Sequence, residues 1–177
     1  MTAHWQYLIA LGSNVGHPYH GPPPAVVRAA LVALETCHLP VILAGPIIAS
    51  APLGPSRRRY ANGAAVIETP LLPEALLDRL QQIENAFGRN RRGQRWRART
   101  LDLDIVLWSG GAHRTTRLAI PHRAYRDRAF VLGPSAQIAA NWRDPETSLC
   151  VKHHHARLTR RARLPKAPPP RSNVPGP

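Results

Sequence analysis

The sequence is poor in cysteine, with only Cys37 and Cys150 among 177 residues. The two are distant and form no CxxC pattern, which argues against a disulfide framework or a zinc site and fits a reducing compartment. The sequence has no apolar run long enough to cross a bilayer, and its first residues lack the basic region of a signal peptide. We therefore expect a cytoplasmic protein with no membrane partner.

The common nucleotide-binding motifs are also missing. No GxxxxGK[ST] occurs, which excludes a P-loop, and the glycine spacing of GSNVG at 12–16 does not fit a dinucleotide fingerprint. Any phosphate must therefore be held by side chains. Acidic residues are scarce, at 10 against 24 lysines and arginines, so the formal charge is +14. Such an excess favours a phosphate-bearing ligand.

Half of this charge lies in residues 151–177, which contain seven basic and no acidic residues. Residues 1–150 are only moderately basic, and their length and apolar content suit a single domain with a real core. We therefore predict a domain over 1–150 and a basic tail over 151–177. The tail has little apolar bulk and many prolines from about residue 165, which is typical of disorder.

Hydrophobic periodicity predicts four strands and two helices. The expected strands cover 5–11, 41–48, 60–68 and 101–107, and the expected helices cover 25–36 and 73–87. This β-α-β-β-α-β order predicts an α+β, ferredoxin-like core, a mainly antiparallel sheet with helices packed on it. Loops 12–24, 49–59 and 88–99 are long enough to be functional. Beyond them we expect a short strand within 114–120 and helical stretches interrupted near Gly133 and Pro134.

The segment RTLDLDI at 99–105 carries the sharpest chemical signal. Strand alternation places Leu101, Leu103, Ile105 and Leu107 on one face and both Asp102 and Asp104 on the other. Such aspartates are often merely solvated. Six arginines lie just before them, however, and guanidinium groups grip phosphate. Two carboxylates suit Mg²⁺, which takes few protein ligands besides phosphate oxygens. The combination indicates a site for a metal–polyphosphate ligand.

Several further motifs accompany this segment in order. They are LGSN at 11–14, APLGP at 51–55, YANGA at 60–64, Gln81 with Glu84, GRNR at 88–91, and IPH at 120–122 followed by Arg128 and Phe130. As a set, over about residues 5–145, they resemble 6-hydroxymethyl-7,8-dihydropterin pyrophosphokinase of folate biosynthesis. The resemblance implies transfer of pyrophosphate from ATP to the pterin hydroxymethyl group, with release of AMP.

The resemblance also implies roles for individual residues. Asp102 and Asp104 match ligands of two Mg²⁺ ions that bridge the triphosphate of ATP, the co-substrate. Arg89, Arg91 and Arg99 match catalytic arginines around the phosphates, and Trp96 matches a tryptophan of a loop that closes over the site. The nucleotide would be bound by Gln81, Glu84, Ile105, Arg117, His122, Arg123 and Arg128. The pterin would be bound by Ser50, Leu53, Tyr60, Asn62 and Phe130. Ser135 stands where a large aliphatic residue is usual.

Two other functions fit parts of the sequence. A basic β-α-β-β-α-β chain can host RNA on an exposed sheet face, but the strands at 60–68 and 101–107 offer only Tyr60 for stacking. A catalytically weak paralogue with a partner-recruiting tail is the other alternative. We expect ATP and the pterin as ligands, a monomer, and nucleic-acid contact only through the basic tail.

Overall fold

The computed structural model describes residues 4–51, 58–88 and 100–160. Its elements follow in chain order: β1 (Trp5–Ser13), α1 (Pro23–Thr36), β2 (Val41–Ala44), β3 (Ile48–Ser50), β4 (Tyr60–Thr69), α2 (Pro73–Ala86), β5 (Asp102–Trp108), β6 (His113–Arg114), β7 (Ala119–Ile120), the 3₁₀ helix η1 (Tyr125–Asp127), α3 (Ala129–Ile138) and α4 (Val151–Thr159). Within the described part, no helix is long and apolar enough to cross a membrane.

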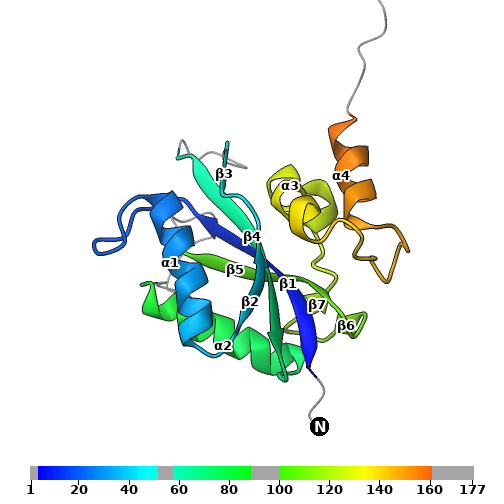
Figure 1. The fold of residues 1–177 in the computed structure, drawn as a ribbon, viewed down its shortest axis with the longest axis horizontal. Coiled ribbons are helices and arrows are strands. Elements are labelled where there is room, and N and C mark those ends of the chain that lie inside the picture. The colour runs from blue at the N-terminus through cyan, green and yellow to red at the C-terminus, as the bar shows by residue number, and fades with distance from the viewer. Residues whose placement is uncertain (1–3, 52–57, 89–99, 161–177) are drawn as a thin grey trace, which may run out of the picture.

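The main sheet has the strand order β2-β4-β1-β5, with β3 also paired to β4. Every pairing in it is antiparallel. The two longest strands, β1 and β4, therefore lie at its centre (Figure 1). The expected α+β class with a mainly antiparallel sheet is confirmed, and the predicted helices are α1 and α2.

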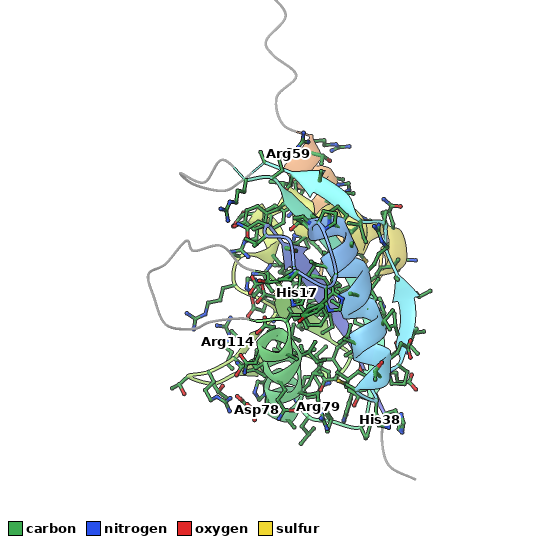
Figure 2. All side chains as sticks on the ribbon, turned by 90° about the vertical axis from the view of Figure 1, so that its left-hand side faces the viewer. His17, His38, Arg59, Asp78, Arg79 and Arg114 are labelled. Carbon is green, nitrogen blue, oxygen red and sulfur yellow. The ribbon has the colours of Figure 1, made fainter. Side chains whose placement is uncertain are left out.

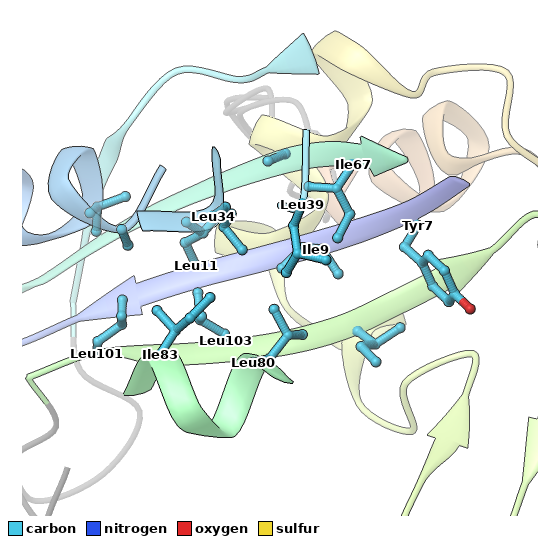
Figure 3. Close-up of a cluster of buried hydrophobic side chains, with 14 of the residues drawn as sticks. Tyr7, Ile9, Leu11, Leu34, Leu39, Ile67, Leu80, Ile83, Leu101 and Leu103 are labelled. Atoms are coloured by element: carbon cyan, nitrogen blue, oxygen red, sulfur yellow. The ribbon is translucent and has the colours of Figure 1, made fainter. Parts of the chain in front are cut away.

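Helices α1 and α2 cover one face of this sheet. Their apolar stripes include Val27 and Leu34 from α1 and Leu80 from α2, and they pack on Ile9 and Leu103. Figure 3 shows Leu34 and Leu80 next to these strand residues. All five side chains are buried. The helical spacing keeps each apolar stripe on one side of its helix, where it faces the apolar side chains that alternate along the strands. This core fixes the face of β5 that carries Leu103 and Ile105.

The opposite face is covered over part of its length by α3. Val131 and Leu132 pack there against Leu8 of β1 and Val66 of β4. Helix α4 lies behind α3, and its first residue, Val151, is fully buried. Figure 1 shows α3 and α4 together on the side of the sheet away from α1. The chain therefore forms three layers, with the sheet in the middle.

Three expectations about element bounds were wrong. The single strand expected over 41–48 is split into β2 and β3 at Gly45 and Pro46, because proline has no N–H for the ladder. The first helix begins at Pro23, since proline suits the first turn. Helix α3 runs through Gly133 and Pro134 without a break. Packing of α3 on β4 offsets the one helical hydrogen bond that proline removes.

The predicted tail begins with an ordered helix. Residues 151–159 form α4, which packs against α3 and η1. A buried ionic network holds it there, because Asp144 accepts from Tyr125 and Arg126 and lies 3.4 Å from Nε2 of His154. The division of the chain at residue 150 stays a prediction. Residues 161–177, with the proline-rich segment, lie outside the described residues.

Candidate functional site

Three strands place one predicted metal ligand, Asp102, and one predicted pterin residue, Asn62, in a single row across the sheet. In the β1–β5 ladder Gly12 is opposite Asp102, and in the β1–β4 ladder the same Gly12 is opposite Asn62. Asp104 is opposite Ala10, which precedes Gly12 by two residues on β1 and therefore points to the same face of the sheet. Residues more than 80 positions apart in sequence thus share one face, which α3 covers only in part.

Asp102 and Asp104 are both partly exposed and alternate with the buried Leu101, Leu103 and Ile105. The predicted common face of the two aspartates is therefore observed. The parity changes beyond Ile105, where β5 has one residue more than β1 between two paired positions. This bulge turns Leu107 to the other core cluster, so its predicted place beside Leu101 was wrong.

The two carboxylates are the right donors for magnesium but do not make a complete protein cage. Among the described residues, no group of three or more His, Cys, Asp and Glu could hold a metal ion. Mg²⁺ is commonly bound through one or two carboxylates, with water and substrate phosphates supplying the other ligands. The pair therefore fits a metal that arrives with a nucleotide rather than a permanent structural ion.

The same bulge brings His122 to Asp104. The carbonyl of Val106 accepts a hydrogen bond from the backbone N–H of His122, at 3.0 Å. The ring then places Nε2 at 3.9 Å from Oδ2 of Asp104. Its Nδ1 accepts from the backbone N–H of Ala124, at 3.2 Å, so a neutral ring carries its proton on Nε2. His122 therefore presents a donor beside the acidic pair.

Burial lowers the pKa of His122, while the negative charges of Asp104 and Asp102 act in the opposite direction. The net direction is downward, which favours the neutral ring at pH 7. A neutral Nε2–H can donate to a phosphate oxygen without adding a full charge. Arg128, whose positive charge also lowers this pKa, supplies the cationic group near the ring.

Three of the predicted pterin residues, Ser50, Tyr60 and Asn62, meet where β3 and β4 pair. Asn62 is buried, and its Nδ2 donates to Oγ of Ser50 at 2.9 Å. Ser50 is opposite Tyr60 in the same ladder. Because its nitrogen is engaged with Ser50, the carbonyl oxygen of Asn62 is directed toward Gly12 and can accept from a ligand. Phe130 of α3 is half-buried, and the guanidinium of Arg128 lies 5.9 Å from its ring centre.

Glu84, which is predicted to contact the nucleotide, lies in the interior next to β5. Its carboxylate comes from α2 and accepts the backbone N–H of Leu103 at 2.8 Å, with only 1% of the residue exposed. Leu103 lies between the two aspartates, so Glu84 holds the strand segment that carries them. Gln81, one turn earlier on α2, is half-buried. The side chain of Ile105 packs in the core against the helical layer.

Arg117 lies near the N-terminal half of α2 rather than beside the aspartates. Its guanidinium bonds to Asp78, which projects from the outer side of α2 (Figure 2), and lies 3.5 Å from Glu74. Asp78 precedes Glu84 by six residues, about 9 Å along a helix. Arg123 is exposed at the start of the η1 region. Both assignments to the nucleotide stay predictions.

Five of the predicted site residues cannot be placed. Leu53, Arg89, Arg91, Trp96 and Arg99 lie outside the described residues. One residue of the row was missed, because the first strand was predicted to end at residue 11 and Gly12 was assigned to the loop 12–24. The strand pattern continues to Ser13, and recognising that would have aligned Gly12 with Asp102.

Comparison with known proteins gives consistent matches. The sequence model of the 7,8-dihydro-6-hydroxymethylpterin-pyrophosphokinase (HPPK) family matches residues 8–140. A 2-amino-4-hydroxy-6-hydroxymethyldihydropteridine pyrophosphokinase from Pseudomonas aeruginosa is 42% identical over 142 residues, covering 78% of this chain and 83% of the relative. An enzyme of the same name from Haemophilus influenzae is 41% identical, covering 81% of this chain and 88% of the relative.

A solved structure supports the same fold. The crystal structure of Plasmodium falciparum HPPK-DHPS with pteroate superposes with a TM-score of 0.68 over 91% of this chain. Sequence identity there is 9%, and this chain spans 43% of that one, so the likeness concerns the fold alone. The row of Asp102, Gly12 and Asn62 thus lies in a known architecture.

Proposed function

The chain belongs to the 7,8-dihydro-6-hydroxymethylpterin-pyrophosphokinase family, and from this membership we propose how its own residues carry out the family's reaction. It transfers pyrophosphate from ATP to the hydroxymethyl group of 6-hydroxymethyl-7,8-dihydropterin in folate biosynthesis. The hydroxymethyl oxygen bonds to the β-phosphorus, and the bond from that phosphorus to the bridging α-oxygen breaks. AMP leaves, and the alcohol proton is released to solvent.

Asp102 and Asp104 hold Mg²⁺ in this proposal, two ions in the full complex. Their common face on β5 and their partial exposure support the assignment. Bound magnesium would neutralise the triphosphate oxygens and orient them for displacement. The protein's own contribution is positioning, because β5 is fixed between β1 on one side and the Glu84 carboxylate on the other.

The nucleotide lies beside this pair. His122 donates from Nε2 to a phosphate oxygen, and Arg128 supplies positive charge nearby, as their positions around Asp104 support. The remaining proposed nucleotide contacts are Gln81, Glu84, Ile105, Arg117 and Arg123. Arg89, Arg91, Arg99 and Trp96 keep their proposed catalytic role, although they lie outside the described residues.

The pterin ring lies at the other end of the row. Asn62 offers its carbonyl oxygen to an N–H of the ring edge, and Ser50 holds the amide in that orientation. Tyr60 and Phe130 supply aromatic surface for a flat heterocycle. Leu53 is proposed to line the same pocket but lies outside the described residues.

The RNA-binding alternative lacks support. It requires an exposed sheet face, but α1 and α2 cover one face and α3 covers part of the other. We further propose a cytoplasmic monomer in which any nucleic-acid contact is made by the basic segment 151–177. Size-exclusion chromatography with light scattering tests the monomer, and a mass of two chains would contradict it.

A coupled assay tests the proposed function and separates it from a catalytically weak paralogue. AMP should form from ATP only when the pterin alcohol and Mg²⁺ are both present. Absence of AMP from a folded protein, under conditions in which a relative is active, would overturn the function.

Asp104→Asn tests the metal assignment. It should lower turnover by at least about a hundredfold because one carboxylate ligand is lost. It should also weaken Mn²⁺ binding measured by electron paramagnetic resonance in the presence of an ATP analogue. Asp127→Asn, an exposed carboxylate on η1, is the matched control and should change neither. Unchanged Mn²⁺ binding in Asp104→Asn would remove this residue from the metal site.

A further inference from the structure

Gly12 is a glycine that the fold itself does not require. Its backbone is an ordinary strand conformation, unlike that of Gly21, Gly88 and Gly111, which have positive φ. A β-carbon added at Gly12 would lie 3.6 Å from Oδ1 of Asn62 and 4.0 Å from Cβ of Asp102. These are normal contact distances, so alanine would fit. Glycine in a strand interior also lowers stability relative to alanine.

The location of Gly12 supplies another reason for the missing side chain. Gly12 is the central member of the row, with the pterin-side Asn62 on one neighbouring strand and the metal-side Asp102 on the other. Adjacent strands are about 4.8 Å apart, so the two outer backbones are separated by roughly 10 Å. A ligand that joins the two ends of the row must cross β1 at this glycine.

Among the described residues, the crossing over β1 remains accessible at Gly12. Two residues earlier on the same face, Ala10 is 8% exposed and packed in the cluster that α3 covers. Gly12 itself is half-exposed, as is Asp102. Asn62 has its nitrogen on Ser50 and its oxygen toward the space above Gly12. The part of this sheet face that α3 leaves uncovered therefore begins, along β1, at Gly12.

We propose that Gly12 determines acceptor specificity by leaving room for the hydroxymethyl arm of the substrate. The arm would pass over the bare backbone of Gly12, from a ring held at Asn62 toward phosphates held at Asp102. A methyl group there would occupy the same space as the arm. The inference rests on the proposed function, because it uses the pterin role of Asn62 and the metal role of Asp102.

Gly12→Ala separates this role from a structural one, because the two predict opposite effects on stability. The variant should melt at the same temperature as the wild type or up to about 4 °C higher. Its kcat/KM for the pterin alcohol should fall by about tenfold to two-hundredfold, the range for one misplaced methyl group. Affinity for an ATP analogue without pterin should remain within about twofold, because ATP alone does not cross the row.

A second ligand sharpens the test. A dihydropterin that lacks the 6-hydroxymethyl group should inhibit the wild type and Gly12→Ala with equal constants, because it has no arm to clash. Gly63→Ala is the matched control. Gly63 is a strand glycine on β4, but an added β-carbon there would meet Val27 and Ile47 on the α1 side. This variant should keep wild-type kcat/KM.

Each outcome decides a different point. If the wild type is inactive, the proposed function fails and the inference with it. If the wild type is active and Gly12→Ala is equally active, the inference alone is wrong. A melting temperature lowered by several degrees, or equal weakening of the ligand without the arm, would also overturn it, because the glycine would then serve the fold or the ring.

Discussion

At the scale of single residues, Glu84 illustrates how a buried polar group can support the site by holding the strand that carries the aspartates. Its carboxylate accepts the backbone N–H of Leu103 from a position that is 1% exposed. Removing a buried acceptor leaves its donor unsatisfied, which costs more than the net value of the hydrogen bond. The segment between Asp102 and Asp104 is held in this way.

We expect Glu84→Ala to lower the free energy of unfolding by about 1 to 3 kcal/mol. Glu84→Gln should lose less, because its amide oxygen can still accept from Leu103. Urea denaturation at pH 7 measures both variants. Equal unfolding midpoints for wild type and Glu84→Ala would show that this hydrogen bond contributes nothing to stability.

Ser135 differs from Glu84 in that its buried hydroxyl has no hydrogen-bond partner among the described residues. It follows Pro134 in α3 and is 1% exposed. Ser135→Ala should leave stability unchanged or raise it by about 1 kcal/mol, because the unsatisfied group is removed. Ser13→Ala is the control: it loses a hydrogen bond to the carbonyl of Val15 and should be destabilised. Thermal unfolding compares the two, and a clear loss in Ser135→Ala would contradict this account.

At the scale of elements, the 3₁₀ helix η1 and α4 are joined by one buried carboxylate. Asp144 is fully buried and accepts from the hydroxyl of Tyr125 at 2.5 Å and from Nε of Arg126 at 2.6 Å. Burial raises the pKa of Asp144, but the hydrogen bonds from Arg126 and Tyr125 outweigh it and hold this pKa well below the usual range. The aspartate is therefore charged and firmly bound.

Asp144→Ala should destabilise the protein by about 3 to 5 kcal/mol, because it leaves a half-buried guanidinium without its main partner. Glu146→Gln is the matched control. Glu146 bonds to the same Arg126, at 2.7 Å, but is exposed, so about 1 kcal/mol or less is expected. Chemical denaturation measures both, and comparable losses would refute the distinction between buried and exposed partners.

The same network makes the attachment of α4 sensitive to pH through His154. Burial lowers the pKa of His154; the Asp144 carboxylate opposes this, and Arg126, Arg157 and His153 add to the lowering. The folded state then binds a proton less readily than the unfolded chain, whose histidines titrate near about 6.5. Stability is present above that pH and is lost as the pH falls toward the folded pKa.

The urea midpoint of the wild type should therefore decrease from pH 7 to pH 5 more than that of His154→Gln. Glutamine can still bond to Oγ1 of Thr147, which lies 3.0 Å from Nε2 of His154. The contribution of Asp144 is lost only at lower pH, so the two groups act in separate windows. Parallel pH profiles for the two proteins would exclude His154 as the titrating group.

At the scale of the whole molecule, charge is distributed unevenly. Residues 161–177 contain four basic and no acidic residues, so removing them lowers the formal charge from +14 to +10. The chain without them should elute from heparin at lower salt, and its affinity for nucleic acid should depend less steeply on salt. Pyrophosphokinase activity should be retained, because the family match ends at residue 140. Unchanged elution would show that these charges do not contact polyanions.

Much of the architecture could be predicted from periodicity. The stripe of Leu76, Leu80 and Ile83 identified α2, and the alternation of Leu101 to Ile105 identified β5 and the face of its aspartates. The continuation of α3 through Pro134 and the bulge at Val106 could not be predicted in this way. Both depend on packing between segments distant in sequence, which outweighs local preference.

Residue types and their spacing establish which chemical groups are available: two carboxylates on one strand face, nearby cationic residues, and the motifs that identify the family. Those properties are local, because side-chain alternation and residue type need no distant partner. Folding alone placed Gly12 between Asn62 and Asp102, His122 beside Asp104, and the Glu84 carboxylate at the backbone N–H of Leu103. Strand register and a bulge fix these neighbours, and both arise from pairing between segments that the chain brings together only on folding.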